Sequence, residues 1–417
     1  MHWGSDMRAR RCALEFASVL FLGALSIACE PPPVVAGGRQ SCGTEDGWVR
    51  CWGAGEYGVL GYGNTNNIGD NEHPRIAGDV WVGGEVESLA LGYYHSCALL
   101  TSGNVRCWGR NDYGQLGRGH TLHIGDNEKP NVGAHVSLGG TATQLTAGVY
   151  HTCALLSTGQ VRCWGLGQFG SLGYANTNNI GDNEHPSSVS TVNIGGTVVE
   201  IKAGWFHTCA RLSTGAVRCW GPNGSGQLGY GHTQTIGDNE HPATAGNVPV
   251  GANVLSLAAG ELHTCALTDL GVKCWGSGDS GRLGYANTLT VLSPASVGFV
   301  NVGADVRVLS AGGSHTCVLT TDLDVRCWGH ALWGQLGYGN PHNIGDNEHP
   351  ATAGNVSVGG PAISISAGYN HTCAVVNGSP HQVRCWGHGG GGRLGYANTN
   401  NIGDNEHPSS VPFVQVR

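Results

Sequence analysis

The amino-acid sequence predicts an all-β protein assembled from a repeated unit. Fourteen of its cysteines fall into seven close pairs, and the first members of successive pairs lie 52 to 56 residues apart, a period typical of propellers and solenoids. The chain has 71 glycines, which suit tight turns between short strands. The fullest unit, residues 145–196, contains short apolar and β-branched runs without helical periodicity. A helical repeat is therefore excluded.

The composition narrows the class of partner. Hydrophobic residues make up 40% of the 417-residue chain and charged residues only 12%, a balance that favours an ordered core over disorder. The formal net charge is −8, and basic residues cluster only near the N-terminus. Because nucleic-acid binding needs clustered Lys and Arg to neutralise phosphates, nucleic acid is not expected as a partner.

The first 33 residues have the features of an export segment. Residues 1–28 predict a signal peptide, with Met7 as a possible true start, a basic stretch at Met7–Arg11 and an apolar stretch at Phe16–Ala28 that is short for a membrane span. Small residues before Cys29 resemble a bacterial lipoprotein box. We therefore expect Cys29 to be lipidated, residues 29–33 to form a short tether, and the protein to be an outer-membrane or cell-surface lipoprotein. The alternative is a secreted protein, since Ser26 departs from the usual aliphatic residue.

Each cysteine pair brackets a predicted β-hairpin. Folding the segment Cys153–Cys163 about its middle places the two cysteines opposite each other, where antiparallel Cα atoms are close enough for a disulfide bond. The first hairpin is one residue shorter, yet a two-residue loop at Asp46 and Gly47 preserves this register. With the export segment, the register predicts seven disulfides rather than buried thiols. The predicted pairs are Cys42 with Cys51, Cys97 with Cys107, Cys153 with Cys163, Cys209 with Cys219, Cys265 with Cys274, Cys317 with Cys327 and Cys373 with Cys385.

One stretch carries a recognisable motif, GYYHSCALLTSGNVRCWGRNDYGQLGRG at Gly92–Gly119, with six counterparts. Its spacing of H-[ST], W-G and G-[QSR]-L-G resembles the repeat of the regulator of chromosome condensation family over nearly all of residues 34–417. The resemblance implies a single domain, a closed seven-bladed β-propeller. The first unit begins late, at Val34–Gly38, and the last overruns to Pro412–Arg417. We therefore expect a C-terminal strand at 412–417 to complete the first blade and close the ring.

Two repeated polar positions are interpreted as structural. The family resemblance implies that the histidine of each unit, replaced by Gln40 in the first, hydrogen-bonds neighbouring backbone. The Arg or Lys before the second cysteine of each pair lies two residues before a Trp, which favours a stacked or hydrogen-bonded element within the blade over an anion site. The histidines are His95, His151, His207, His263, His315 and His371.

Variable aromatic residues are the candidate binding positions. They lie at two loop positions, one just before the repeated histidine and one before G-[QSR]-L-G, where the units otherwise differ from one another. In the implied architecture these loops share one face around the channel mouth, where large amphipathic aromatics suit a protein-binding surface. The alternative is packing between blades. The residues are Tyr57, Tyr93, Tyr94, Tyr113, Tyr150, Phe169, Trp205, Phe206, Trp333 and Tyr369.

The run IGDNEHP occurs five times, first at Ile68–Pro74, and a sixth copy reads IGDNEKP at Ile124–Pro130. Its Gly-Asp-Asn stretch suits a turn, and its Pro suits the exit into an extended strand. The fifth unit replaces the run but keeps Pro294, so the run is interpreted as a turn between blade segments. The weaker alternative is a calcium site at its carboxylates, such as Asp70 and Glu72 or Asp182 and Glu184.

The repeat offers little support for catalysis. The sequence has no nucleophile elbow, P-loop or H-E-x-x-H motif. It also lacks the inserted wedge on which, by resemblance, nucleotide exchange in the family's nuclear namesake depends. We expect a monomeric, noncatalytic protein-binding module without a cofactor, on the bacterial cell surface or secreted. The alternatives are a calcium- or glycan-binding surface protein acting through the acidic loops, and an enzyme such as a lyase or hydrolase.

Overall fold

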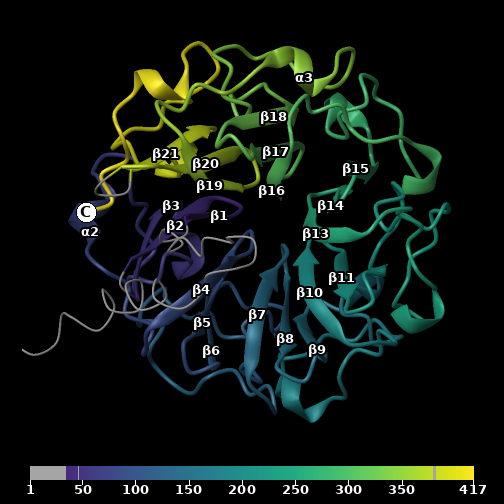
Figure 1. The fold of residues 1–417 in the computed structure, drawn as a ribbon. Helices are drawn as coiled ribbons and strands as arrows, with labels where there is room; N and C mark the ends of the chain where they lie inside the picture. Colours follow the sequence, from purple (N-terminus) through teal and green to yellow (C-terminus); the bar gives the residue numbers. More distant parts are fainter. Residues whose placement is uncertain (1–33, 46, 379–381) are drawn as a thin grey trace, which may run out of the picture.

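The structure, a computed structural model, describes residues 34–45, 47–378 and 382–417. Seven small sheets surround a central axis in sequence order, from the purple first blade to the yellow-green last one (Figure 1). Each blade holds three strands, which confirms the all-β, seven-bladed propeller. The predicted signal peptide, Cys29 and the tether lie outside the described residues. In the described part of the chain, no helix is long and apolar enough to cross a membrane.

The first strand of each blade lies nearest the axis, and the second and third follow outward (Figure 1). The blades contain β1–β3 (Val34–Ala36, Gln40–Glu45, Trp48–Gly53), β4–β6 (Val86–Leu91, His95–Leu100, Val105–Gly109), β7–β9 (Ala142–Ala147, His151–Leu156, Val161–Gly165), β10–β12 (Val198–Ala203, Thr208–Leu212, Val217–Trp220), β13–β15 (Val254–Ala259, His263–Thr268, Gly271–Gly276), β16–β18 (Val306–Ala311, His315–Thr320, Val325–Gly329) and β19–β21 (Ala362–Ala367, His371–Val376, Gln382–Gly387).

Short helical turns lie in the connections between strands. They are α2 (Pro74–Ala77) and α3 (Pro350–Ala353), with the 3-10 turns η1 (Glu56–Gly58), η2 (Gln168–Gly170), η3 (Pro186–Ser188), η4 (Pro242–Thr244), η5 (Asp279–Gly281), η6 (Pro294–Ser296), η7 (Gly390–Gly392) and η8 (Pro408–Ser410).

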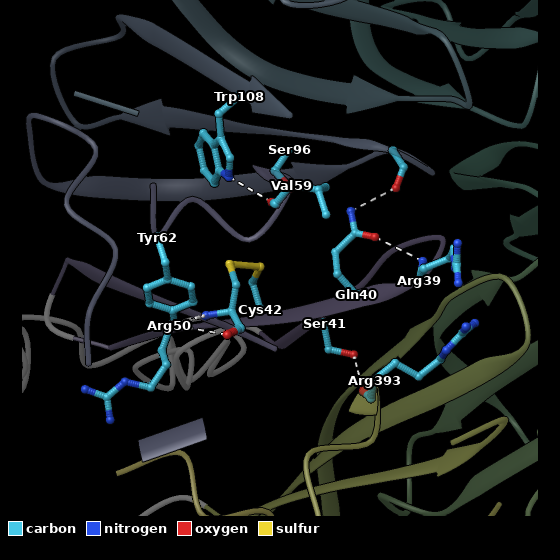
Figure 2. Close-up of a disulfide and its surroundings, with 12 residues drawn as sticks. Arg39, Gln40, Ser41, Cys42, Arg50, Val59, Tyr62, Ser96, Trp108 and Arg393 are labelled. Carbon is cyan, nitrogen blue, oxygen red and sulfur yellow. Dashed lines mark hydrogen bonds between the residues drawn. A yellow bond between two sulfur atoms is a disulfide. The ribbon is translucent and has the colours of Figure 1, made fainter. Parts of the chain in front are cut away.

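The disulfide prediction is confirmed in every blade. Cys153 on β8 directly opposes Cys163 on β9, and the Cα atoms are 4.1 Å apart. The other six pairs have the same register, with Cα–Cα distances of 4.0–4.1 Å, and all fourteen cysteines are buried. Each bond therefore joins the second and third strands of one blade, as Figure 2 shows for the first. The bonded pairs are Cys42 with Cys51, Cys97 with Cys107, Cys153 with Cys163, Cys209 with Cys219, Cys265 with Cys274, Cys317 with Cys327 and Cys373 with Cys385.

Backbone carbonyls anchor one blade to the next. Thr152 and Trp164 of the third blade both donate to the Gln115 oxygen of the second, at 3.0 and 2.9 Å. The same pairing recurs at the Val59 oxygen, which accepts from Ser96 and Trp108 at 2.9 Å each (Figure 2). Where the pairing occurs, a carbonyl of one blade satisfies two buried donors of the next, whereas Nε1 of Trp52 and Nε1 of Trp220 are buried without a hydrogen-bond partner. The pairing is also present at the carbonyls of Gln227, Arg282 and Gln335.

The repeated histidines join the same junctions. His95 Nε2 lies 2.8 Å from Thr152 Oγ1 of the next blade, and the other five histidines contact a Thr or Ser hydroxyl in the same way. The expectation of a backbone partner is wrong for them, although Gln40 does donate to the Gly92 carbonyl at 3.1 Å. Since the Thr152 hydrogen goes to the Gln115 carbonyl, Nε2 of His95 must be the donor. Burial lowers the pKa of His95 to about 3, so the imidazole is neutral at pH 7.

Hydrogen bonds also join the last blade to the first. Ser41 Oγ of β2 lies 2.8 Å from His371 Nε2 of β20, and Tyr369 N donates to the Gly37 oxygen at 3.0 Å. The first blade has its own inner strand, β1, which pairs with β2. The ring therefore closes through contacts between these two blades.

The C-terminal segment lies at this seam, but its predicted strand assignment was wrong. Val414 bridges Val383 of β21, so the segment adds to the seventh blade rather than completing the first. Segment 412–417 still reaches the first blade, because Arg50 donates to the Val416 oxygen. The physical reason for the difference is that β1 already occupies the inner edge of the first blade.

The Arg or Lys before the second cysteine hydrogen-bonds backbone carbonyls, as interpreted, within its own blade for Arg162 and Lys273 and also in the preceding blade for Arg218 and Arg326. Arg162 donates to the Pro186 carbonyl at 2.7 Å, and Lys273 donates to the Pro294 carbonyl at 2.9 Å. These carbonyls belong to the short turns that lead into the outer segment of the blade. The aromatic contact of Lys273 is with Phe299, whose ring centroid lies 5.2 Å from the ammonium, rather than with Trp275.

The IGDNEHP run packs at the boundary between blades. A Cβ placed on Gly181 would lie 2.5 Å from the Gly114 oxygen of the preceding blade, and the φ of Gly181 is +96°. The Gly181 oxygen also accepts a hydrogen bond from Gly119 of that blade at 3.0 Å. Within the run, Glu184 accepts from Gly181 N at 3.4 Å, so the carboxylate stabilises its own turn. This arrangement supports the interpretation of the run as a scaffold turn.

Removing one disulfide should weaken the blade that carries it. For the double substitution Cys153→Ala/Cys163→Ala, we expect the free energy of unfolding to fall by about 3 kcal/mol, because a closed loop of this size constrains the unfolded chain. Urea unfolding of oxidised protein measures the change. Thr158→Ala, at the exposed turn of the same hairpin, is the matched control and should have little effect. Equal stability of the double variant and the control would contradict the prediction.

The buried histidines should make the fold acid-sensitive. Burial lowers the pKa of His207 to about 3, whereas the unfolded chain titrates near 6.5. The unfolded state therefore binds more protons below pH 6.5, and the free energy of unfolding should fall as the pH drops from 6.5 toward 3. The variant His207→Gln has the residue found naturally at position 40. In this variant the dependence of the free energy of unfolding on pH should become less steep, by up to about 1.4 kcal/mol per pH unit between pH 6.5 and 3. Denaturant titrations at pH 7, 6 and 5 measure this pH dependence. The same pH dependence in the variant and the wild type would contradict the prediction.

If the IGDNEHP run is a scaffold turn, its glycine should contribute more to the stability of the fold than its glutamate. Gly181→Ala should destabilise the protein markedly, because the new methyl group meets the Gly114 carbonyl and the backbone has positive φ. Glu184→Gln should lower the free energy of unfolding by less than about 1 kcal/mol, because only one long hydrogen bond is weakened. Melting curves with and without calcium test both variants. A large rise in the melting temperature of the wild type at micromolar calcium, abolished by Glu184→Gln, would restore the metal-site interpretation.

Candidate functional site: the aromatic face

The candidate site is formed by loops at one end of the strands. In each blade one loop joins the first strand to the second, and in the second blade it carries Tyr93 and Tyr94 between β4 and β5. Another loop leaves the third strand, and it carries Tyr57 after β3 and Tyr113 after β6. The second strand begins opposite the end of the third, as His95 opposes Gly109. Both sets of loops therefore gather at the same end of the ring.

Eight of the ten predicted aromatic residues form one connected cluster. They come from the first, second, third, fourth and seventh blades, and the ring centroids of contacting pairs are 4.5 to 6.3 Å apart. All eight are half-buried, so each ring packs on its neighbours and still presents part of its surface to solvent. The members of this aromatic cluster are Tyr57, Tyr93, Tyr94, Tyr113, Tyr150, Trp205, Phe206 and Tyr369.

Three of these rings meet at the mouth of the central channel. Tyr93, Trp205 and Tyr369 come from three different blades, yet their ring centroids are only 4.6 to 5.9 Å apart. All three line the channel, a cavity of about 260 Å³ whose walls are the innermost strands. Because the rings contact one another across the axis, they cover this end of the channel. The outcome is a broad aromatic surface rather than an open pore.

An arginine is built into the cluster. The Arg110 guanidinium lies 4.9 Å from the Tyr57 ring centroid and 5.3 Å from those of Tyr94 and Tyr150. Asp112 accepts from its Nε at 2.5 Å, so the side chain is held in one orientation. Sequence reasoning missed Arg110. The available signal was that the corresponding position differs between units, being for example Ala54, Leu166 or Pro222.

Three phenol groups of the cluster, those of Tyr93, Tyr150 and Tyr369, are neutral at physiological pH. Partial burial raises the pKa of Tyr93, Tyr150 and Tyr369 above the ordinary value of 10.0. Neutral phenols combine an apolar ring with a hydroxyl that both donates and accepts hydrogen bonds. The surface can therefore bind by ring burial and by hydrogen bonding together.

The other two predicted aromatics lie apart from the aromatic cluster. Trp333 packs on His388, with centroids 4.6 Å apart, and Phe169 is 51% exposed. The same end of the ring also exposes Leu122 and Leu289 by 71% and 70%. Sequence reasoning missed these leucines, although Asn, Gln or His stands at their position in the other units. They add apolar area around the aromatic cluster.

The acidic runs do not form metal clusters in the described ranges, where no group of three or more His, Cys, Asp or Glu side chains is placed to hold an ion. Asp70 accepts from Asn67 at 3.0 Å and Glu72 from Gly69 at 3.3 Å. Asp182 and Glu184 belong to the equivalent run of the third blade, where Glu184 bonds its own turn. The runs lie at separate blade boundaries.

Comparisons with known proteins agree with this fold. The model of the RCC1-like domain family matches residues 48–417. The ultraviolet-B receptor UVR8 of Arabidopsis thaliana is 31% identical over 70% of this chain, and the probable E3 ubiquitin-protein ligase HERC6 of Homo sapiens is 32% identical over 81%. The chain spans 62% of the length of UVR8 and 30% of that of HERC6.

Solved structures show the same architecture. Yeast RCC1 (Prp20), solved in complex with Kap60, superposes with a TM-score of 0.67 at 21% identity and covers 94% of this chain and 90% of its own. Human WBSCR16 gives a TM-score of 0.64 at 20% identity, covering 79% and 83%. The family model accounts for all seven blades except the first strands of the first. The chain therefore belongs to the RCC1-like domain family.

Proposed function

We propose that this protein is a noncatalytic protein-binding module whose partner contacts the aromatic face. One observation carries the proposal: eight half-exposed aromatic residues from five blades form a single connected surface at one end of the ring. Aromatic side chains and arginine are enriched among residues that dominate the binding energy of protein interfaces. The aromatic cluster and Arg110 together have this composition.

The position of the cluster supports binding over a purely structural role. Buried contacts between blades are made by other residues, such as the histidines, the Thr and Ser hydroxyls and the repeated Trp. The blades without aromatics at these loops still pack in the same way, since Gly313 N donates to the Gly368 oxygen at 3.2 Å. The packing of the blades therefore does not require aromatic residues at these loop positions.

The relatives support the class of ligand. Yeast RCC1 (Prp20) was solved in complex with Kap60, and a separate structure of Prp20p accompanies its binding properties to Gsp1p and histones. Those partners belong to that protein. For this chain the net charge of −8 and the predicted export segment support a partner outside the cell or at its surface. Localisation as a surface lipoprotein or a secreted protein is part of the proposal.

Truncating the aromatic cluster should weaken partner binding without unfolding the protein. For Trp205→Ala/Tyr150→Ala we expect a loss of at least tenfold in affinity, because interface aromatics often contribute about 2 kcal/mol or more each. A photo-crosslinking residue at Tyr94 would first capture the partner on intact cells, and titration of the purified pair would then measure the affinity. Trp81→Ala, on the opposite end of the strands, is the matched control. Equal affinities of the cluster variant and the control would rule out this face.

A further inference from the structure

The first blade carries an exposed tryptophan pair that the other blades lack. Val49 and Val80 form an antiparallel bridge, so Trp48 and Trp81 stand directly opposite each other on the outer edge of the blade. Their ring centroids are 5.1 Å apart, and the two residues are 42% and 41% exposed. The same pair of positions in the other six blades holds Asn/Ser, Gln/Asn, Ala/Pro, Gly/Asn, Asp/Ser and Gln/Gln. The fold therefore forms without aromatics at these positions.

The tryptophan pair lies at the end of the strands away from the aromatic face. In the first blade Gln40 opposes Gly53 at the aromatic end, and Glu45 opposes Trp48 at the other end. The inner strand β1 runs from Val34, opposite Gly43, toward the aromatic end. The chain thus enters the propeller from the end that carries the tryptophans.

The entry point of the chain and Trp48 border the same groove. Val34, Trp48 and Phe413 all line a groove of about 420 Å³ between the first and seventh blades. Cys29, the predicted lipidation site, precedes Val34 by five residues, so a fully extended chain places its Cα within about 18 Å of Val34. An acyl chain on Cys29 would therefore hold this end of the first blade near the bilayer surface.

We propose that the Trp48–Trp81 pair contacts the headgroup region of a lipid bilayer and orients the propeller with its aromatic face outward. Tryptophan favours the membrane interface because its ring is amphipathic. Further exposed apolar residues lie at the same end of the strands, including Leu255 at 49% and Leu270 at 66%.

The inference concerns the end opposite the aromatic face and does not depend on the identity of any protein partner. It depends on the predicted anchor only for proximity to the membrane. The two proposals can therefore fail separately: a variant of the tryptophan pair tests lipid contact, and a variant of the aromatic cluster tests partner binding.

The test uses the full chain, produced with its N-terminal segment and reconstituted on phosphatidylcholine/phosphatidylethanolamine vesicles. Part of the phosphatidylcholine carries brominated acyl chains, which quench tryptophan fluorescence at short range. We expect brominated vesicles to lower the emission of the wild type relative to unbrominated ones. This difference should be lost in Trp48→Ala/Trp81→Ala and restored in part by a single Trp at either position.

Trp205→Ala/Trp333→Ala is the matched control and should keep the full bromolipid effect, because those residues lie at the other end. Both double variants should melt within a few degrees of the wild type, since the replaced side chains are partly exposed. Three outcomes would overturn the proposal: equal quenching in Trp48→Ala/Trp81→Ala, no quenching of wild type that sediments with the vesicles, or a response of Trp48 and Trp81 to soluble oligosaccharides but not to lipid.

Discussion

At five blade junctions the structure depends on a backbone carbonyl that accepts two hydrogen bonds from the next blade. In the second blade this carbonyl is the Gln115 oxygen, which receives Thr152 and Trp164. Burying either donor without a partner would cost roughly 1–3 kcal/mol. At these five junctions this requirement accounts for the fixed spacing of the Trp and the Thr or Ser. The residue that supplies the carbonyl varies among Val, Gln and Arg, because only its backbone oxygen takes part in the hydrogen bonds.

The same constraint separates residues that hold the ring from residues that are free to change. The histidine Nε2 atoms and the Thr or Ser hydroxyls at the junctions pair across blades, and the cysteines bond within their own blade. The side chains of the loops beyond the junction do not make these bonds, so they vary between blades. The aromatic cluster and the Trp48–Trp81 pair are both departures from the repeat, at opposite ends of the strands. In a repeat protein such departures are the places where a binding role can be recognised.

Residue types associated with catalysis or metal binding serve the scaffold here. The six junction histidines are fully buried and have lowered pKa values, so at neutral pH they act as neutral hydrogen-bond donors. The Glu of the repeated run bonds its own turn, while its glycine permits close approach of two blades. Repetition from blade to blade, with tolerated replacements such as Gln40, distinguishes these scaffold positions from a single functional site.

The sequence alone determined the all-β class, the seven units, the hairpin register and the seven disulfides, because these depend on local spacing and on strand periodicity. It also located the aromatic positions. Only the tertiary structure decided which aromatics meet: Tyr93, Trp205 and Tyr369 converge from separate blades, whereas Trp333 lies apart. Tertiary structure also decided that the C-terminal segment pairs with the seventh blade, since strand 412–417 could add to either side of the seam. Such contacts join residues far apart in the chain, and the angle of each blade about the axis sets them.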